Sequence, residues 1–88
     1  LMRELKVTIK STTGLHARPA SVLVNAVSKF KSTITVEKQG QEANLKSLLG
    51  LLSLGVSQND EIIIKVDGKD ENQVIEALIN CGETHNLW

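Results

Sequence analysis

The sequence predicts an α+β protein in which one four-stranded antiparallel sheet carries three helices on a single face. Apolar and polar residues alternate near residues 5–9, 33–37 and 61–67, and this period of two is typical of strands with one buried face. Elsewhere apolar residues recur at spacings of three and four, which indicates amphipathic helices. The resulting order is βαββαβα, and helices on one face leave the other face of the sheet in water.

Length and composition limit what such a chain can be. Its 88 residues, of which 41% are hydrophobic, suffice for a single domain over residues 1–88 with one modest core. Ten basic residues balance ten acidic ones, so the near-zero net charge argues against general nucleic-acid binding. Phe30 and Trp88 are the only aromatic residues, which argues against a base-stacking surface as well.

The first third of the chain predicts a strand, a loop and a helix. Leu5, Val7 and Ile9 alternate with polar residues, and residues 11–14 are all turn formers. Residues 17–29 predict the first helix because of the three- and four-residue spacing of their apolar side chains. We expect its buried stripe to consist of Ala20, Leu23, Val27 and Phe30.

A hairpin and a late strand complete the sheet. Residues 33–37 alternate as the second strand, Gly40 permits a tight turn, and residues 42–44 return as a short edge strand. The nearly continuous apolar run at residues 61–67 predicts a central strand. Its core-facing residues are expected to be Ile62, Ile64 and Val66.

The third helix is expected to start at a capping box formed by Asp70 and Gln73 and to stop at Gly82. Its predicted buried stripe consists of Val74, Ile75, Leu78 and Ile79. The tail over residues 83–88 matches no pattern, and whether it is ordered is left open. We expect His85 to be a mobile tail residue rather than a ligand.

A short second helix, predicted from Ser47 to about Leu54 and ended by Gly55, carries leucines on almost every side. A helix of this length on a small domain cannot bury all of its sides. Some leucines should therefore face solvent or a partner, and an exposed apolar patch marks an interaction site. The alternative is that this helix is sunk into the core.

The loop before the first helix holds the candidate reactive group. Gly14 permits a tight turn and Pro19 is tolerated in the first helical turn, so His16 should stand at or just before a helix N-terminus. Unpaired N–H groups and the helix dipole favour an anion there, and Arg18 adds a fixed positive charge. A nucleophilic imidazole at such a place is suited to carrying a phosphoryl group. The alternative is an ordinary surface or capping histidine.

Two motifs resemble one known family. The heptapeptide GLHARPA, from Gly14 to Ala20, resembles the active-site motif of HPr, the histidine-containing phosphocarrier family of the bacterial phosphoenolpyruvate–sugar phosphotransferase system. A second HPr-like motif follows at the matching distance, over residues 45–55, and the resemblance spans about residues 5–82. It implies an open-faced β-sandwich and a carrier protein that needs no cofactor and is not itself an enzyme.

The resemblance also implies roles for particular residues. His16 would become a phosphohistidine, accepting a phosphoryl group from phosphorylated Enzyme I and passing it to sugar-specific EIIA domains in sugar transport. Arg18 would stabilise the phosphate, and Leu48, Leu49 and Leu52 would form the partner-binding patch. Many relatives carry methionine in place of Leu49 and Leu52, and leucine keeps the apolar area but loses some adaptability.

Ser47 has two interpretations. Serine is a favoured N-cap, and Ser47 directly precedes the leucine helix. It also resembles the regulatory serine of HPr from Gram-positive bacteria, where HPr kinase/phosphorylase produces a phosphoserine and the product binds a catabolite-control transcription factor in carbon catabolite repression. An alternative function is therefore a regulatory protein that acts mainly through Ser47. An unrelated anion-binding α+β domain would leave this segment unexplained.

The remaining features bear on the compartment. Cys81 is the only cysteine, so no internal disulfide can form, which suits a reducing cytosol. The sequence shows no apolar run long enough for a membrane helix, no signal-peptide pattern and no metal-ligand cluster. We therefore expect a cytoplasmic protein with no metal site, no direct nucleic-acid binding and no membrane insertion, in which Cys81 is inert.

Overall fold

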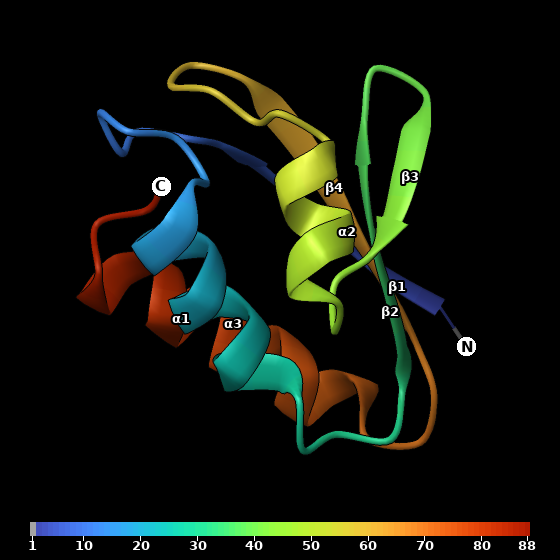
Figure 1. Ribbon diagram of the computed structural model, residues 1–88. Helices are drawn as coiled ribbons and strands as arrows, with labels where there is room; N and C mark the ends of the chain where they lie inside the picture. The colour runs from blue at the N-terminus through green and yellow to red at the C-terminus, as the bar shows by residue number, and fades with distance from the viewer. Residues whose placement is uncertain (1) are drawn as a thin grey trace.

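One antiparallel sheet organises the computed structural model, which describes residues 2–88 (Figure 1). The strands are β1 (Met2–Thr8), β2 (Thr33–Lys38), β3 (Gln41–Asn44) and β4 (Glu61–Asp67), in the order β1-β4-β2-β3. The place of β4 between β1 and β2 confirms the predicted central strand. The short edge strand β3 is confirmed too, and positive φ at Gln39 (51°) and Gly40 (82°) gives the hairpin turn before it.

Three helices lie on one side of this sheet within residues 2–88: α1 (Ala17–Val27), α2 (Leu48–Ser53) and α3 (Glu71–Thr84). Figure 1 shows that they leave the opposite side uncovered. The predicted α+β fold, an open-faced β-sandwich with the order βαββαβα, is therefore confirmed. The prediction that α1 reaches Lys29 is wrong by two residues, because Ser28 is its C-cap, and Phe30 lies half-buried beyond the end.

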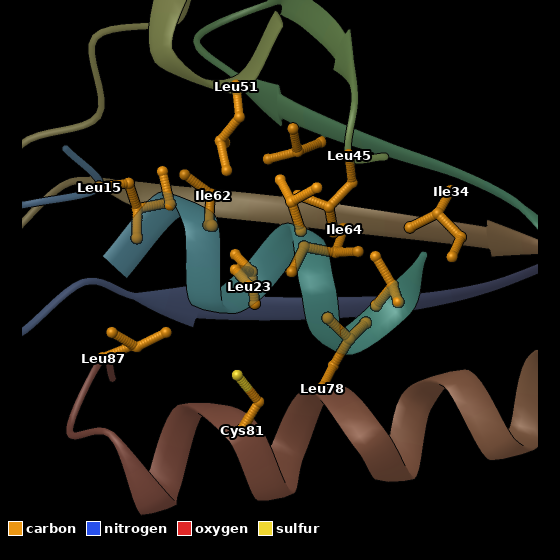
Figure 2. Close-up of a cluster of buried hydrophobic side chains, with 14 of the residues drawn as sticks. Leu15, Leu23, Ile34, Leu45, Leu51, Ile62, Ile64, Leu78, Cys81 and Leu87 are labelled. Atoms are coloured by element: carbon orange, nitrogen blue, oxygen red, sulfur yellow. The ribbon is translucent and has the colours of Figure 1, made fainter. Parts of the chain in front are cut away.

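The core fills the space between the sheet and the helices (Figure 2). Leu23 of α1, Leu51 of α2 and Leu78 of α3 are fully buried together with Ile62 and Ile64 of β4. The predicted stripe of α1 is confirmed at Ala20, Leu23 and Val27, and Val24 joins it. This packing fixes the position of the start of α1 relative to the sheet.

The uncovered face of the sheet is held by charged side chains. The Nζ atom of Lys65 on β4 lies 2.8 Å from Glu37 Oε1 on β2 and 3.0 Å from Glu42 Oε2 on β3. Hydrogen bonds to Glu37 and Glu42 raise the pKa of Lys65, so the ammonium stays charged at any physiological pH. These contacts connect three neighbouring strands on the side away from the helices.

The start of α3 differs from the prediction. Asp70 is the N-cap residue, but its side chain makes no cap hydrogen bond among residues 2–88, so the capping box with Gln73 is wrong. Its carboxylate instead accepts the N–H groups of Lys31 (2.8 Å) and Ser32 (3.0 Å) and the Ser32 hydroxyl. Tertiary packing brings these donors to Asp70, and a sequence pattern that considers only local partners cannot include them.

Two further predictions for α3 are wrong. Ile79 is 38% exposed, and Cys81 takes its place in the buried stripe beside Val74, Ile75 and Leu78. Gly82 does not end the helix, which continues to Thr84 before the chain reverses at Asn86 (φ 56°). A Cβ at position 82 would overlap the Trp88 indole, so the glycine serves packing rather than helix termination. The tail folds against the protein through the buried Leu87, and His85 is the C-cap residue of α3 with an exposed side chain.

Within residues 2–88, α3 is the longest helix, and no helix there has the length and hydropathy needed to cross a membrane.

Candidate functional site

The loop between β1 and α1 is shaped by Gly14. Its φ of 65° lies in the left-handed region, and a Cβ at this position would overlap the Val56 carbonyl oxygen. The Gly14 N–H donates to the Ser11 carbonyl at 3.0 Å, and the Leu15 N–H donates to the Val56 carbonyl at 3.0 Å. Leu15 is buried, so the loop is fixed immediately before His16.

His16 is the N-cap residue of α1, with an extended backbone (φ −92°, ψ −177°). Its carbonyl accepts the Ala20 N–H at 2.9 Å, which starts the helix, while the side chain is exposed and makes no cap bond to any residue in the described part of the chain. The prediction that His16 stands at a helix N-terminus is confirmed. The imidazole is thus directed to solvent from a backbone that is hydrogen-bonded at Leu15 and at His16 itself.

The first turn of α1 leaves donors for an external anion. Helix geometry gives no intrahelical partner to the first N–H groups, and Pro19, the third helical residue, has no N–H. The amides of Ala17 and Arg18 are therefore the helical donors at this end. The first turn contains no acidic residue among those described, and the exposed Arg18 side chain supplies positive charge.

Ser47 lies at the start of α2 and is confirmed as its N-cap. Its backbone is extended (φ −106°, ψ 113°), and its hydroxyl accepts the Gly50 N–H at 3.0 Å. Its carbonyl accepts the Leu51 N–H at 2.9 Å. The residue is half-buried, so the hydroxyl is used within the protein but is not sealed from solvent.

The leucine patch, defined as Leu48, Leu49 and Leu52, lies on the outer side of α2. These side chains are 39%, 79% and 37% exposed, whereas Leu51 on the opposite side is fully buried. The alternative in which the whole helix is sunk into the core is therefore wrong. Three adjoining exposed leucines provide the apolar surface expected of a protein-binding site.

The start of α1, at His16, and the start of α2, at Ser47, lie near opposite ends of α2. In Figure 1, α1 descends and α2 ascends, so the His16 end of α1 lies beside the loop that leaves α2, which the Leu15–Val56 bond confirms. Ser47 begins α2 at its far end. A six-residue helix is about 9 Å long, and the leucine patch begins on this helix directly after Ser47.

Sequence reasoning missed the residues that hold the loop after α2. The Lys38 ammonium donates to the Gly55 carbonyl at 2.8 Å and pairs with Asp60 Oδ2 at 3.0 Å. Asp60 also accepts the Ser57 N–H at 2.8 Å, and this bond together with Lys38 lowers the pKa of Asp60. No sequence signal identifies this cluster, because Lys38 is far from its partners along the chain.

Two other kinds of reactive site, a metal centre and a reactive thiol, find no support in the described residues. Within residues 2–88 no group of three or more histidine, cysteine or acidic residues could hold a metal ion. Cys81 is buried between α1 and α3, and burial raises the pKa of its thiol, which disfavours the reactive thiolate.

Comparison with known proteins places these features in a family. A family model described as the PTS HPr component phosphorylation site matches residues 3–83. The phosphocarrier protein HPr of Mycoplasma genitalium is 44% identical over 87 residues, covering 98% of this chain and 99% of that protein. A solved mycoplasma histidine-containing phosphocarrier protein superimposes with a TM-score of 0.93 at 36% identity and 97% coverage of both chains.

A third similar structure is Crh, the catabolite-repression protein of Bacillus subtilis. It superimposes with a TM-score of 0.73 at 38% identity, covering 91% of this chain and 92% of that chain. The fold and the family match together define a small α+β protein of the phosphocarrier class. The chain belongs to the HPr family of phosphocarrier proteins of the phosphotransferase system.

Proposed function

We propose that His16 carries a phosphoryl group from phosphorylated Enzyme I to sugar-specific EIIA domains, within a single cytoplasmic domain that does not turn over by itself. The observation that carries this proposal is the exposed His16 imidazole at an uncapped helix start, in a chain that matches the family model for an HPr phosphorylation site. A carrier needs a nucleophile that two partners can reach in turn. An exposed imidazole on a fixed backbone meets that need.

The transfer is a substitution at phosphorus. The lone pair of an imidazole nitrogen of neutral His16 forms the new N–P bond while the bond between phosphorus and the donor enzyme breaks, and the donor keeps that electron pair. The group then moves to EIIA by the same chemistry, which restores the free imidazole. The Ala17 and Arg18 amides and the Arg18 guanidinium stabilise the phosphoryl oxygens at the positive end of α1.

The leucine patch provides the docking surface for Enzyme I and EIIA in this proposal. The patch lies on α2, and the loop that follows α2 is bonded through Val56 to Leu15, the residue before His16. A partner that covers the patch would therefore bring its own phosphoryl site toward the imidazole. Burial of exposed leucines on association is favourable in proportion to the apolar area removed from water.

Ser47 is proposed as a regulatory site for HPr kinase/phosphorylase. A phosphate there would add about −1.5 to −2 charges beside the leucine patch. Apolar docking would then carry a desolvation cost and, with an acidic partner, a repulsion. The dipole at the start of α2 stabilises a negative group at this position, so the fold itself is expected to survive.

A second candidate is a regulatory protein that acts mainly through phosphorylated Ser47 and a catabolite-control transcription factor. The similarity to Crh favours it. The exposed His16 favours the carrier, because a purely regulatory protein has no need for that imidazole. The two functions are compatible in one chain.

Phosphoenolpyruvate-dependent labelling separates these candidates. The wild-type chain and His16→Ala are incubated with Enzyme I and labelled phosphoenolpyruvate. We expect acid-labile phosphate on the wild type and none on His16→Ala. A wild-type chain that takes up no phosphate would exclude the carrier function and leave the regulatory candidate.

A further inference from the structure

The C-terminal segment, residues 85–88, folds back from α3 toward the loop that precedes α1 (Figure 1). Asn86 has a φ of 56°, its N–H donates to the Glu83 carbonyl at 3.3 Å, and the Leu87 N–H donates to the Gly82 carbonyl at 2.8 Å. These two bonds form a Schellman motif, which reverses the chain at a helix end. The reversal directs Leu87 into the core, where it is fully buried.

Leu87 is bonded to the loop that leads to His16. Its carbonyl accepts the Lys10 N–H at 2.8 Å and the Ser11 N–H at 3.4 Å. The Ser11 carbonyl in turn accepts the Gly14 N–H at 3.0 Å. Figure 2 shows Leu87 at the same end of the core as Leu15, which directly precedes His16. A continuous series of backbone bonds therefore connects the C-terminal segment to the turn at Gly14.

Trp88, the residue after Leu87, packs on the surface of α3. Its indole lies against Gly82 so closely that a Cβ at position 82 would overlap the ring. Glycine inside a helix is less favourable than alanine. At position 82 the missing side chain leaves the space that the Trp88 indole occupies. The ring thus packs on the same residue, Gly82, whose carbonyl accepts the Leu87 N–H.

We propose that Leu87 and Trp88 are positioning residues for phosphoryl transfer, which hold residues 10–14 in the conformation that places His16 at the start of α1. This inference rests on the proposed carrier function. Neither residue touches the reacting atoms, and both act through the backbone of the loop. Because coupling between two sites is reciprocal, a phosphoryl group on His16 that shifts the loop also changes the surroundings of Trp88.

The fluorescence of the wild-type chain tests this coupling without any substitution. The sequence has one tryptophan and no tyrosine, so its emission reports on Trp88 alone. The chain is phosphorylated with phosphoenolpyruvate and a trace of Enzyme I, the enzyme is removed, and uptake is measured with labelled phosphate. We expect the emission of Trp88 to change with uptake and to return on hydrolysis, while His16→Ala shows no change.

The possible failures are distinguishable. Phosphate uptake with unchanged emission would overturn the positioning role and leave the carrier function intact. If no phosphate is taken up, the carrier function itself fails, and the positioning role falls with it.

Substitution of Trp88 gives a second test. With the chain as substrate of Enzyme I, we expect Trp88→Ala to lower kcat about tenfold with KM unchanged, because the loop is misplaced while the leucine patch is intact. Trp88→Phe keeps a ring over Gly82 and should stay within about twofold of wild type. Gln73→Ala, an exposed change at the other end of α3, is the control. A folded Trp88→Ala protein with wild-type kcat would contradict the proposal.

Discussion

The starts of α1 and α2 differ in how they satisfy their free N–H groups. Both N-cap residues, His16 and Ser47, have extended backbones, and both carbonyls accept the first helical bond. The Ser47 hydroxyl also accepts the Gly50 N–H, whereas the His16 side chain is exposed and bonds to no helical amide in the described chain. A capped helix start stabilises the fold, while an uncapped start keeps its donors for a ligand.

Arg18 gives the sharpest test of the uncapped start. Arg18→Ala should slow phosphate uptake by His16 about tenfold or more, because a hydrogen bond to a charged group contributes about 1.5–3 kcal/mol. Arg18→Lys should be intermediate, since it keeps the charge but loses the planar fork. Stopped-flow transfer from Enzyme I measures both rates.

The control for Arg18 is Lys29→Ala, which removes the same charge just beyond the other end of α1. If Lys29→Ala slows transfer as much as Arg18→Ala does, the effect is one of overall charge, and Arg18 has no specific role at His16.

A negative charge at the capped start tests whether the two helix starts communicate. Ser47→Asp should slow phosphorylation of His16 about fivefold, since a new charge beside the leucine patch costs about 1 kcal/mol when a partner docks. The melting temperature should change little, because aspartate is also a good N-cap. Ser47→Asn keeps the cap without the charge and should transfer at the wild-type rate. Equal rates of His16 phosphorylation in Ser47→Asp and Ser47→Asn would show that a charge at Ser47 does not affect docking.

Alanine at each helix start separates capping from chemistry. Ser47→Ala should lower the free energy of unfolding by about 1 kcal/mol through the lost bond to Gly50. His16→Ala should change it by less than about 0.5 kcal/mol, because its side chain is exposed. Urea unfolding measures both. As a control, Ser53→Ala removes a hydroxyl from the same helix without touching the cap, and a loss as large as that of Ser47→Ala would argue against the capping role.

The start of α3 adds a third arrangement, in which Asp70 bonds to the chain before β2. Hydrogen bonds from Ser32 and Lys31 lower the pKa of Asp70 from its ordinary value in the folded protein. A carboxyl with a lowered folded pKa stabilises the fold above its unfolded pKa of about 3.9 and loses this contribution as the pH falls through the folded value. Below about pH 5, unfolding free energy should therefore fall more steeply in wild type than in Asp70→Asn. Asp67→Asn is the control, and equal slopes for Asp70→Asn and wild type would contradict the linkage.

Local patterns predicted most of the fold. Period-two alternation identified the strands, and the apolar run of β4 identified its central place, because both depend on which face of a strand is buried. The loop glycines and the serine cap were equally readable, since their effects involve neighbours a few residues away. The site residues were proposed from the helix-start chemistry of His16 and from the HPr resemblance.

Contacts between distant residues decided the rest. Asp70 looked like a local cap, but folding places Lys31 and Ser32 within its reach, and two backbone bonds and a hydroxyl outcompete a single cap. Gly82 looked like a helix stop, but the Trp88 indole explains why glycine is needed there.

The amino-acid sequence by itself therefore determined the order of elements, the sheet with its covering helices, and the place of His16 before a helix. Only the tertiary structure decided between an outward leucine patch and a wholly buried helix, and only it showed that Lys38 holds the loop after α2 and that Leu87 bonds to Lys10. The physical reason is the range of the interactions. Backbone dihedrals, caps and periodicity act over a few residues, whereas these later contacts exist only once the helices have packed on the sheet.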